Sequence, residues 1–252
     1  MSDWLLSRRV LPWLVTLATF LLWEGLVHAF SIQSFILPPP SLVASTLAAQ
    51  WEPIFEHSLQ TLMTTLVGLA LAVGFGVGLG LAVGASERVY SGLYPLLVAF
   101  NSIPKVALVP ILVIWFGIGT VPAILTAFLI SFFPIVVNIA TGLATVEPEL
   151  NDLMRSLGAN RLTVLQKVGL PRTLPYFFAA LKVAVTLAFV GSVISETVAA
   201  NAGVGYMMMV AGSRFEVPLV FAGLVVVGAM GIVLYQIFEW LERRLTFWAA
   251  RG

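Results

Sequence analysis

Between Val106 and Val146 the chain carries no Asp, Glu, Lys or Arg. A helix needs roughly 20 apolar residues to cross a membrane, so this stretch is too long for a single crossing. The segment from Gly117 to Pro122 divides it, because glycine and proline interrupt helices. The stretch therefore predicts two consecutive membrane spans, which is possible only in a protein embedded in lipid.

The composition of the whole chain agrees with a membrane protein. Hydrophobic residues make up 60% of the 252 positions and charged residues only 10%, with a mean hydropathy of +1.01. A soluble domain carries about 25% charged residues, so this chain could not cover its surface in water. The net charge of +1 offers no broad basic surface for nucleic acid. The absence of cysteine excludes disulfides, thiol catalysis and Cys-ligated metals.

The apolar stretches predict an all-α bundle of about six spans, forming one domain over residues 1–252. Arg8 and Arg9 precede a first apolar stretch that is too long for a cleavable signal, so we expect it to stay as a span. The longest polar connection covers about residues 147–173. The expected spans are residues 10–30, 59–85, 93–116, 122–143, 175–200 and 217–238.

The distribution of basic residues predicts the orientation of the spans. Cytoplasmic loops of membrane proteins are enriched in Lys and Arg. With the N-terminus inside, the opposite loops contain Arg214, and Lys182 near the inner end of the fifth span can extend towards the cytoplasm. Both termini and residues 147–173 are therefore expected in the cytoplasm. The basic residues on that side are Arg8, Arg9, Arg88, Arg155, Arg161, Lys167, Arg172, Arg243, Arg244 and Arg251.

The polar segment contains a short amphipathic helix. Its apolar residues recur at i, i+3, i+4 and i+7, and a break follows at Gly158-Ala159-Asn160. A second short helix, about residues 162–168, is expected to end at Leu170-Pro171 and Pro175 before the next span. The stripe suits insertion into a groove of a partner, but it suits packing on the neighbouring spans equally well. It consists of Leu150, Leu153, Met154 and Leu157.

The string NDLMRSLGANRLTVLQKVGLP resembles the "EAA" loop of ABC-importer permeases. In that family pattern Glu-Ala-Ala is followed by three residues, Gly, nine residues, Ile, one residue and Leu-Pro. Gly158, Leu170 and Pro171 match, and Val168 stands for the Ile, whereas the Glu-Ala-Ala positions are only approximated chemically. The resemblance implies a coupling helix that docks on a cytoplasmic ATPase. The implied coupling residues are Asp152, Leu153, Met154, Leu157, Gly158, Ala159, Leu170 and Pro171.

Other strings are similar to permeases of the nitrate, taurine and alkanesulfonate import family, among them LPPPSLVASTL and SIPKVALVPILVIWFGIGTVPAIL. This resemblance covers nearly the whole chain. It implies a type I ABC-importer fold in a bacterial inner membrane, a homodimer of permeases, two ATPase subunits and an external binding protein. The implied substrate is a small organic or inorganic anion such as a sulfonate or nitrate, and the alternative is a vitamin or a pyrimidine precursor.

The chain lacks a phosphate-binding loop, which needs a Lys directly after Gly. Lys105, Lys167 and Lys182 follow Pro, Gln and Leu. We therefore expect no enzyme and no cofactor on this chain, with ATP and Mg bound by the partner ATPase. His28 and His57 are far apart and lack acids at ligand spacing, so no metal is expected.

Two other classes of protein were weighed. A stand-alone secondary transporter or channel would show inverted repeats or a cluster of mid-membrane charges. A membrane-bound enzyme would need a catalytic constellation near one interface. The sequence presents neither pattern.

Polar residues at membrane depth are candidates for the transport pathway or its gates, because such residues are costly to bury in lipid. Lys105 could attract an anion, or it could reach the interface or pair with an acid. Glu24 and Glu196 lie towards the outer ends of their spans, where they could also be interface or helix-end residues. The pathway or gate candidates are Asn101, Lys105, Asn138 and Glu196.

Gly76, Gly80 and Gly84 form a ridge of small residues on the second span. Such a ridge allows the backbones of two helices to approach closely in lipid. The partner helix could belong to the same subunit or to a second copy.

Overall fold

The computed structural model describes residues 10–84, 87–145 and 147–246, which form helices and connecting turns without any strand. The basic residues Arg8, Arg9 and Arg251 that entered the orientation argument lie outside these ranges. The helices are α2 (Leu11–Ala29), α3 (Pro40–Ala49), α4 (Trp51–Gly84), α5 (Glu87–Ser102), η1 (Lys105–Leu108), α6 (Val109–Phe116), α7 (Thr120–Ala144), α8 (Pro148–Ser156), α9 (Arg161–Val164), η2 (Leu165–Gly169), α10 (Leu170–Ala199), α11 (Val204–Ser213) and α12 (Val217–Leu245).

Within the described ranges, five helices are long and apolar enough to cross a membrane, and a bent pair adds a sixth span if its two parts are counted together. The predicted all-α bundle of about six spans is thus confirmed. α4 and α12 are longer than predicted, since they begin at Trp51 and end at Leu245 respectively. The short apolar helix α11 was not predicted, because its ten residues cannot span a membrane.

The core of the bundle lies between α4, α7 and α10. α4 presents a row of small residues to α7 at every fourth position, and there a Cβ atom on a glycine would meet α7 at contact distance or closer. At Gly80 that Cβ would lie 2.8 Å from the Cβ of Ile139. The predicted ridge therefore packs against a helix of its own subunit. The row consists of Gly68, Ala72, Gly76, Gly80 and Gly84.

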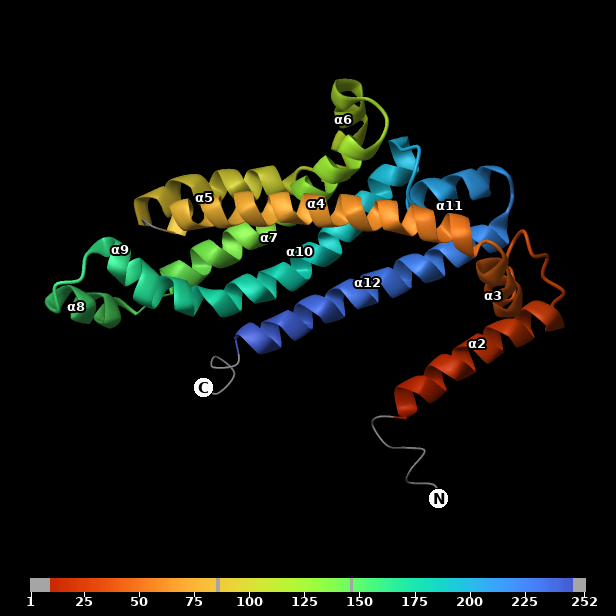
Figure 1. The fold of residues 1–252 in the computed structure, drawn as a ribbon, viewed down its shortest axis with the longest axis horizontal. Coiled ribbons are helices and arrows are strands. Elements are labelled where there is room, and N and C mark those ends of the chain that lie inside the picture. Colours follow the sequence, from red (N-terminus) through yellow and green to blue (C-terminus); the bar gives the residue numbers. More distant parts are fainter. Residues whose placement is uncertain (1–9, 85–86, 146, 247–252) are drawn as a thin grey trace, which may run out of the picture.

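The third predicted span, residues 93–116, is not one straight helix. α5 ends at Ser102, and η1 and α6 continue after a bend of 74°. Pro104 explains the break, because proline provides no backbone N–H and excludes the residue before it from helical geometry. In Figure 1 α6 consequently projects from the bundle, whereas α5 lies beside α4.

The prediction that Leu170-Pro171 and Pro175 end a short helix before the fifth span is wrong. Residues Leu162–Ala199 form one helix of 38 residues that passes through the π-turn η2. Pro171 directly follows that π-turn, and the continuous helix accommodates it there. Pro175 lies inside α10 without ending it.

Figure 1 shows the small helices gathered at opposite ends of the bundle. α8 and α9 lie at one end, and α3 and α11 lie at the other. The long helix of residues Leu162–Ala199 connects the two ends, because α9 begins it and α11 follows it.

Candidate functional site

The segment with the amphipathic stripe folds as predicted into a helix, a break and a second helix. α8 ends at Ser156, and Gly158 follows with φ +81°. The N–H of Ala159 donates to the carbonyl oxygen of Met154 at 3.0 Å. A left-handed glycine and a six-to-one hydrogen bond define a Schellman motif, which reverses the chain after a helix. Gly158 therefore fixes the direction in which the chain leaves α8 and enters α9.

The apolar stripe of α8 is only partly covered. Leu153 is 57% exposed and Leu157 is 74% exposed, whereas Leu150 and Met154 are half-buried. Asp152 is exposed on the same helix. The two exposed leucines are therefore largely uncovered by the neighbouring spans. They form an apolar surface at the end of the bundle that carries α8 and α9.

Two side-chain contacts fix the base of this segment. Asn160 Oδ1 accepts hydrogen bonds from the backbone N–H and the hydroxyl of Thr163, at 2.8 and 2.9 Å, and so caps α9. Arg172 donates to Glu147 at 3.1 Å, which joins the beginning of the segment to the first turn of α10. Leu170 and Pro171 lie at the same junction, where they line an apolar cleft of about 400 Å³ between α4, α7 and α10.

Glu196 lies at the opposite end of the bundle and is 1% exposed. One carboxylate oxygen accepts from the Thr61 hydroxyl at 2.8 Å and from the Gly205 N–H at 3.1 Å. The hydroxyls of Thr64 and Ser192 lie 3.3 and 3.4 Å from the other oxygen and 2.5 Å from each other. A buried carboxylate is stable only when its oxygens have such partners, so this site is satisfied by groups from three helices.

α4 also binds the turn before α11. The hydroxyl of Thr61 accepts from the N–H of Val204 at 2.9 Å, and Nδ1 of His57 accepts from the N–H of Gly203 at 3.1 Å. Gly203 has φ +105°, and a Cβ there would overlap the carboxyl group of Glu196. Only glycine fits this position. We call the set His57, Thr61, Thr64, Ser192, Glu196, Gly203 and Gly205 the Glu196 cluster.

Of the residues in the Glu196 cluster, the sequence predicts only Glu196 as a pathway or gate candidate. A usable signal was present, because His57, Thr61 and Thr64 occupy i, i+4 and i+7 of an apolar helix and hence share one face. Ser192 precedes Glu196 by four residues and lies on the same side of α10.

Lys105 is bound at the break of the third span. Its ammonium group donates to the side-chain and backbone oxygens of Asn101, at 2.6 and 2.7 Å. Asn101 lies in the last turn of α5, where carbonyl groups lack helical partners. Two of the three N–H groups of Lys105 are thus used to close the end of α5.

Two further polar residues of the spans have partners in the structure. Asn138 donates to the carbonyl oxygen of Pro134 in its own helix at 2.9 Å. Lys182 pairs with Glu242 of α12 at 2.6 Å, with side chains 23% and 21% exposed. The pair links α10 to α12.

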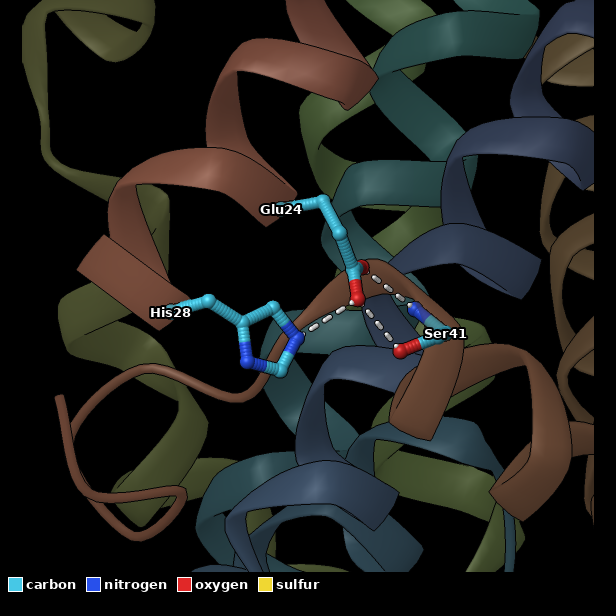
Figure 2. A network of polar contacts seen from close by, with 3 residues as sticks. All are labelled: Glu24, His28 and Ser41. Atoms are coloured by element: carbon cyan, nitrogen blue, oxygen red, sulfur yellow. Dashed lines mark hydrogen bonds and ion pairs between the residues drawn. The ribbon is translucent and has the colours of Figure 1, made fainter. Parts of the chain in front are cut away.

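Glu24 joins the first span to α3 (Figure 2). Its carboxylate accepts from the backbone N–H of Ser41 at 3.0 Å and from the hydroxyl of Ser41 at 2.7 Å, and His28 lies 3.0 Å away. Ser41 is in the first turn of α3, so the carboxylate satisfies a free N–H at the positive end of that helix. Among the described residues, no three His, Asp or Glu side chains come together as metal ligands would.

The chain is similar to known proteins over most of its length. A family described as "Binding-protein-dependent transport system inner membrane component" matches residues 73–247. A formylaminopyrimidine transport permease of Halalkalibacterium halodurans is 34% identical, over 94% of this chain and 95% of its own length. A taurine transport system permease of Escherichia coli is 32% identical, over 97% of this chain and 92% of its own length.

A solved structure agrees with the fold. One chain of the MetNI methionine ABC transporter, in an inward-facing conformation, superposes with a TM-score of 0.69. The match has 18% sequence identity and covers 79% of this chain and 98% of the other. At this identity the likeness concerns the fold, which is the type I importer-like bundle that the sequence predicted.

Proposed function

Because the chain belongs to the family of binding-protein-dependent transport system inner membrane components, it is the permease subunit of an ABC importer, and we propose that α8 is the helix through which an ATPase drives it. The family works with an ATPase and a substrate-binding protein. The single observation that carries the proposal is the exposed apolar surface of Leu153 and Leu157 at the end of the bundle. ATP and Mg would be bound by the ATPase, and this chain would bind no cofactor.

The geometry of α8 suits this role. α8 packs against α9, and α9 begins the 38-residue helix that ends beside α11. A force applied to α8 would therefore act on one end of a continuous helix. Exposed leucines on a short helix are the typical anchors of a helix that docks in a groove. Asp152 could make a polar contact at the rim of that groove.

The orientation proposed from the basic residues puts α8, α9 and both termini in the cytoplasm. A direct test uses the absence of cysteine in the chain. Ser156→Cys and Ser213→Cys would each place a single exposed thiol, one at the end of α8 and one at the end of α11. A membrane-impermeant maleimide should label Ser213→Cys in whole cells and Ser156→Cys only in inverted vesicles. The reverse pattern would overturn the orientation.

A homodimer of permeases with two ATPase subunits is the proposed assembly. The sequence shows no evident internal repeat, so a pathway on a symmetry axis needs a second copy. Many apolar side chains of α2, α5 and α6 are exposed, which provides surface for lipid and for such a copy. Mass determination of the purified complex tests the two-to-two stoichiometry.

The proposed substrate is a small anion such as a sulfonate or nitrate. The relative for taurine supports it, whereas the relative for formylaminopyrimidine supports the alternative of a pyrimidine precursor or vitamin. Lys105 contributes little to this choice, because two of its N–H groups already bind Asn101. The substrate is tested by reconstituting the permease with its ATPase and binding protein and screening ligands for stimulated ATP hydrolysis.

Substitutions in α8 test the coupling role in the reconstituted complex. With a bifunctional maleimide–amine reagent, Leu157→Cys should become crosslinked to a lysine of the ATPase, and Leu153→Asp should abolish import while the permease remains folded. Leu162→Asp is a matched control, because Leu162 is equally exposed but lies on the next helix. Normal import by Leu153→Asp would refute the assignment of α8.

A further inference from the structure

We propose that Glu196 is a positioning residue that transmits the movement of the coupling helix to α11. Its carboxylate fastens the far end of the long helix to α4 and to the backbone of α11. This inference rests on the proposed function of α8, and it concerns the end of the bundle that no ATPase touches.

The long helix joins the end of the bundle that carries α8 to Glu196. Residues Leu162–Ala199 are helical without a break, and at 1.5 Å per residue they extend roughly 57 Å. This length exceeds the hydrocarbon thickness of a bilayer, about 30 Å. α8 and α9 are attached to its beginning, and Glu196 lies in its last turn. A displacement of the beginning is therefore carried to the turn that contains Glu196.

Glu196 binds two other helices at that end of the long helix. Its donors come from Thr61 of α4 and from Gly205 of α11, which are far apart in sequence. Thr61 donates to the carboxylate and accepts from Val204, so one hydroxyl joins α4, α10 and α11. Without these contacts, α11 would be attached to α4 by apolar packing and by the hydrogen bond between His57 and Gly203.

Two further hydrogen bonds lie at the same end of the bundle as Glu196. The N–H of Gly119 donates to the carbonyl oxygen of Ala199 at 3.3 Å, and Gln60 donates to Thr120 at 3.0 Å. The beginning of α7 is therefore tied both to the end of α10 and to α4. A movement of the long helix reaches α4, α7 and α11 through polar contacts that have defined directions, unlike apolar packing, which permits sliding.

Two glycines allow the backbone at the beginning of α11 to approach Glu196 closely. Here Gly203 and Gly205 bring the backbone so close that a Cβ on either would overlap Glu196 or the carbonyl oxygen of Val193. Close backbone approach to a fully buried carboxylate leaves α11 little freedom to move independently of α10. The cluster thus makes the end of α10 and α11 one moving unit.

The first experiment measures whether α11 is held. Ala211 of α11 is 2% exposed, and the chain has no other thiol, so Ala211→Cys reports opening of α11 through its labelling rate in membranes. Glu196→Gln and Thr61→Val should each raise that rate about tenfold or more, since a buried donor or acceptor that loses its partner is costly. Thr61→Ser keeps the hydroxyl and should leave the rate unchanged.

A second thiol separates local opening from general loosening. Ala140 of α7 is 1% exposed and lies in the part of the bundle near α8 and α9. Ala140→Cys should keep its slow labelling in the Glu196→Gln and Thr61→Val backgrounds. Faster labelling at both thiols would mean that Glu196 only stabilises the fold, and unchanged labelling at Ala211→Cys would mean that it does not hold α11. Either result overturns the proposal.

The second experiment measures transmission in the reconstituted complex. Substrate-loaded binding protein should stimulate ATP hydrolysis of the parent complex, and in Glu196→Gln and Thr61→Val the ratio of stimulated to basal rate should fall towards one while the basal rate persists. Thr61→Ser should retain the parent ratio. An unchanged ratio in Glu196→Gln would overturn the positioning role. If the parent itself shows no stimulation and Leu157→Cys no crosslink, the proposed function fails, whatever the thiol labelling shows.

Discussion

Replacing Gly80 by Ala should force α4 and α7 apart, whereas the same replacement at Gly78 should not. A Cβ at Gly80 would lie 2.8 Å from the Cβ of Ile139 and 3.0 Å from the carbonyl oxygen of Val136. Carbon atoms in contact are normally about 3.5–4.0 Å apart, so the helices would have to separate by roughly 1 Å. A Cβ at Gly78 meets nothing within 4 Å.

The two substitutions differ in their expected free energies. Overpacking costs about 1–3 kcal/mol, and replacing a helical glycine by alanine returns up to about 1 kcal/mol. Gly80→Ala should therefore lower the free energy of unfolding by up to about 2 kcal/mol, while Gly78→Ala should leave it unchanged or raise it by up to about 1 kcal/mol.

Thermal unfolding in detergent, followed by circular dichroism, compares the two variants under identical conditions. Because the chemical change and the helix are the same, the difference between them isolates the contact with α7. Equal unfolding temperatures for Gly80→Ala and Gly78→Ala would refute the claim that the row of small residues sets the distance between α4 and α7.

Three further predictions concern single contacts. Gly158→Val should abolish import because a β-branched residue resists φ +81°, while Gly158→Asn, which tolerates left-handed geometry, should retain most of it; transport assays compare the two, and equal loss would contradict the backbone argument. Lys182→Met should lower the free energy of unfolding by roughly 1–3 kcal/mol through loss of the partner of Glu242, and the double variant with Glu242→Gln should recover part of it; a double-mutant cycle measures this, and additive losses would argue against coupling. Ser41→Ala should lower the stability of α3 by about 1 kcal/mol through loss of the hydroxyl bond to Glu24, measured as faster hydrogen exchange of α3 than in Ser45→Ala, whose hydroxyl binds only its own helix; equal exchange would remove the role of the Ser41 hydroxyl.

The sequence predicted the class of fold because the energetic rule is simple. Stretches without charge must lie in lipid, and the stretch from Val106 to Val146 required two crossings. The break at Gly158 was also predictable, since a glycine after an amphipathic helix is the usual helix-ending residue. These features depend on local composition and spacing.

The prediction that prolines end a helix before the fifth span is wrong, because a proline does not always end a helix. Pro104 breaks the third span, whereas Pro171 and Pro175 lie in a continuous helix. The difference is one of position: Pro171 occupies the first turn of α10, directly after the π-turn. Sequence spacing alone does not reveal a π-turn, because its extra residue has no distinctive side chain.

The Glu196 cluster could not be assembled from the sequence, because its parts lie in three helices whose mutual rotation depends on packing. The same applies to Lys105, whose hydrogen bonds to Asn101 could not be read from the sequence and whose place in the pathway stays a prediction. A polar side chain in a span predicts that a partner exists, but not which one.

The π-turn at Leu165–Gly169 makes the helix tolerant of a length change at one place. A π-turn contains one residue more than an α-turn, so deleting a single residue there can be absorbed by returning the turn to α geometry. The same deletion in the middle of α10 would rotate all preceding residues by about 100° and aim α8 in a different direction. A single-residue deletion at the π-turn should therefore preserve the register between α8 and Glu196.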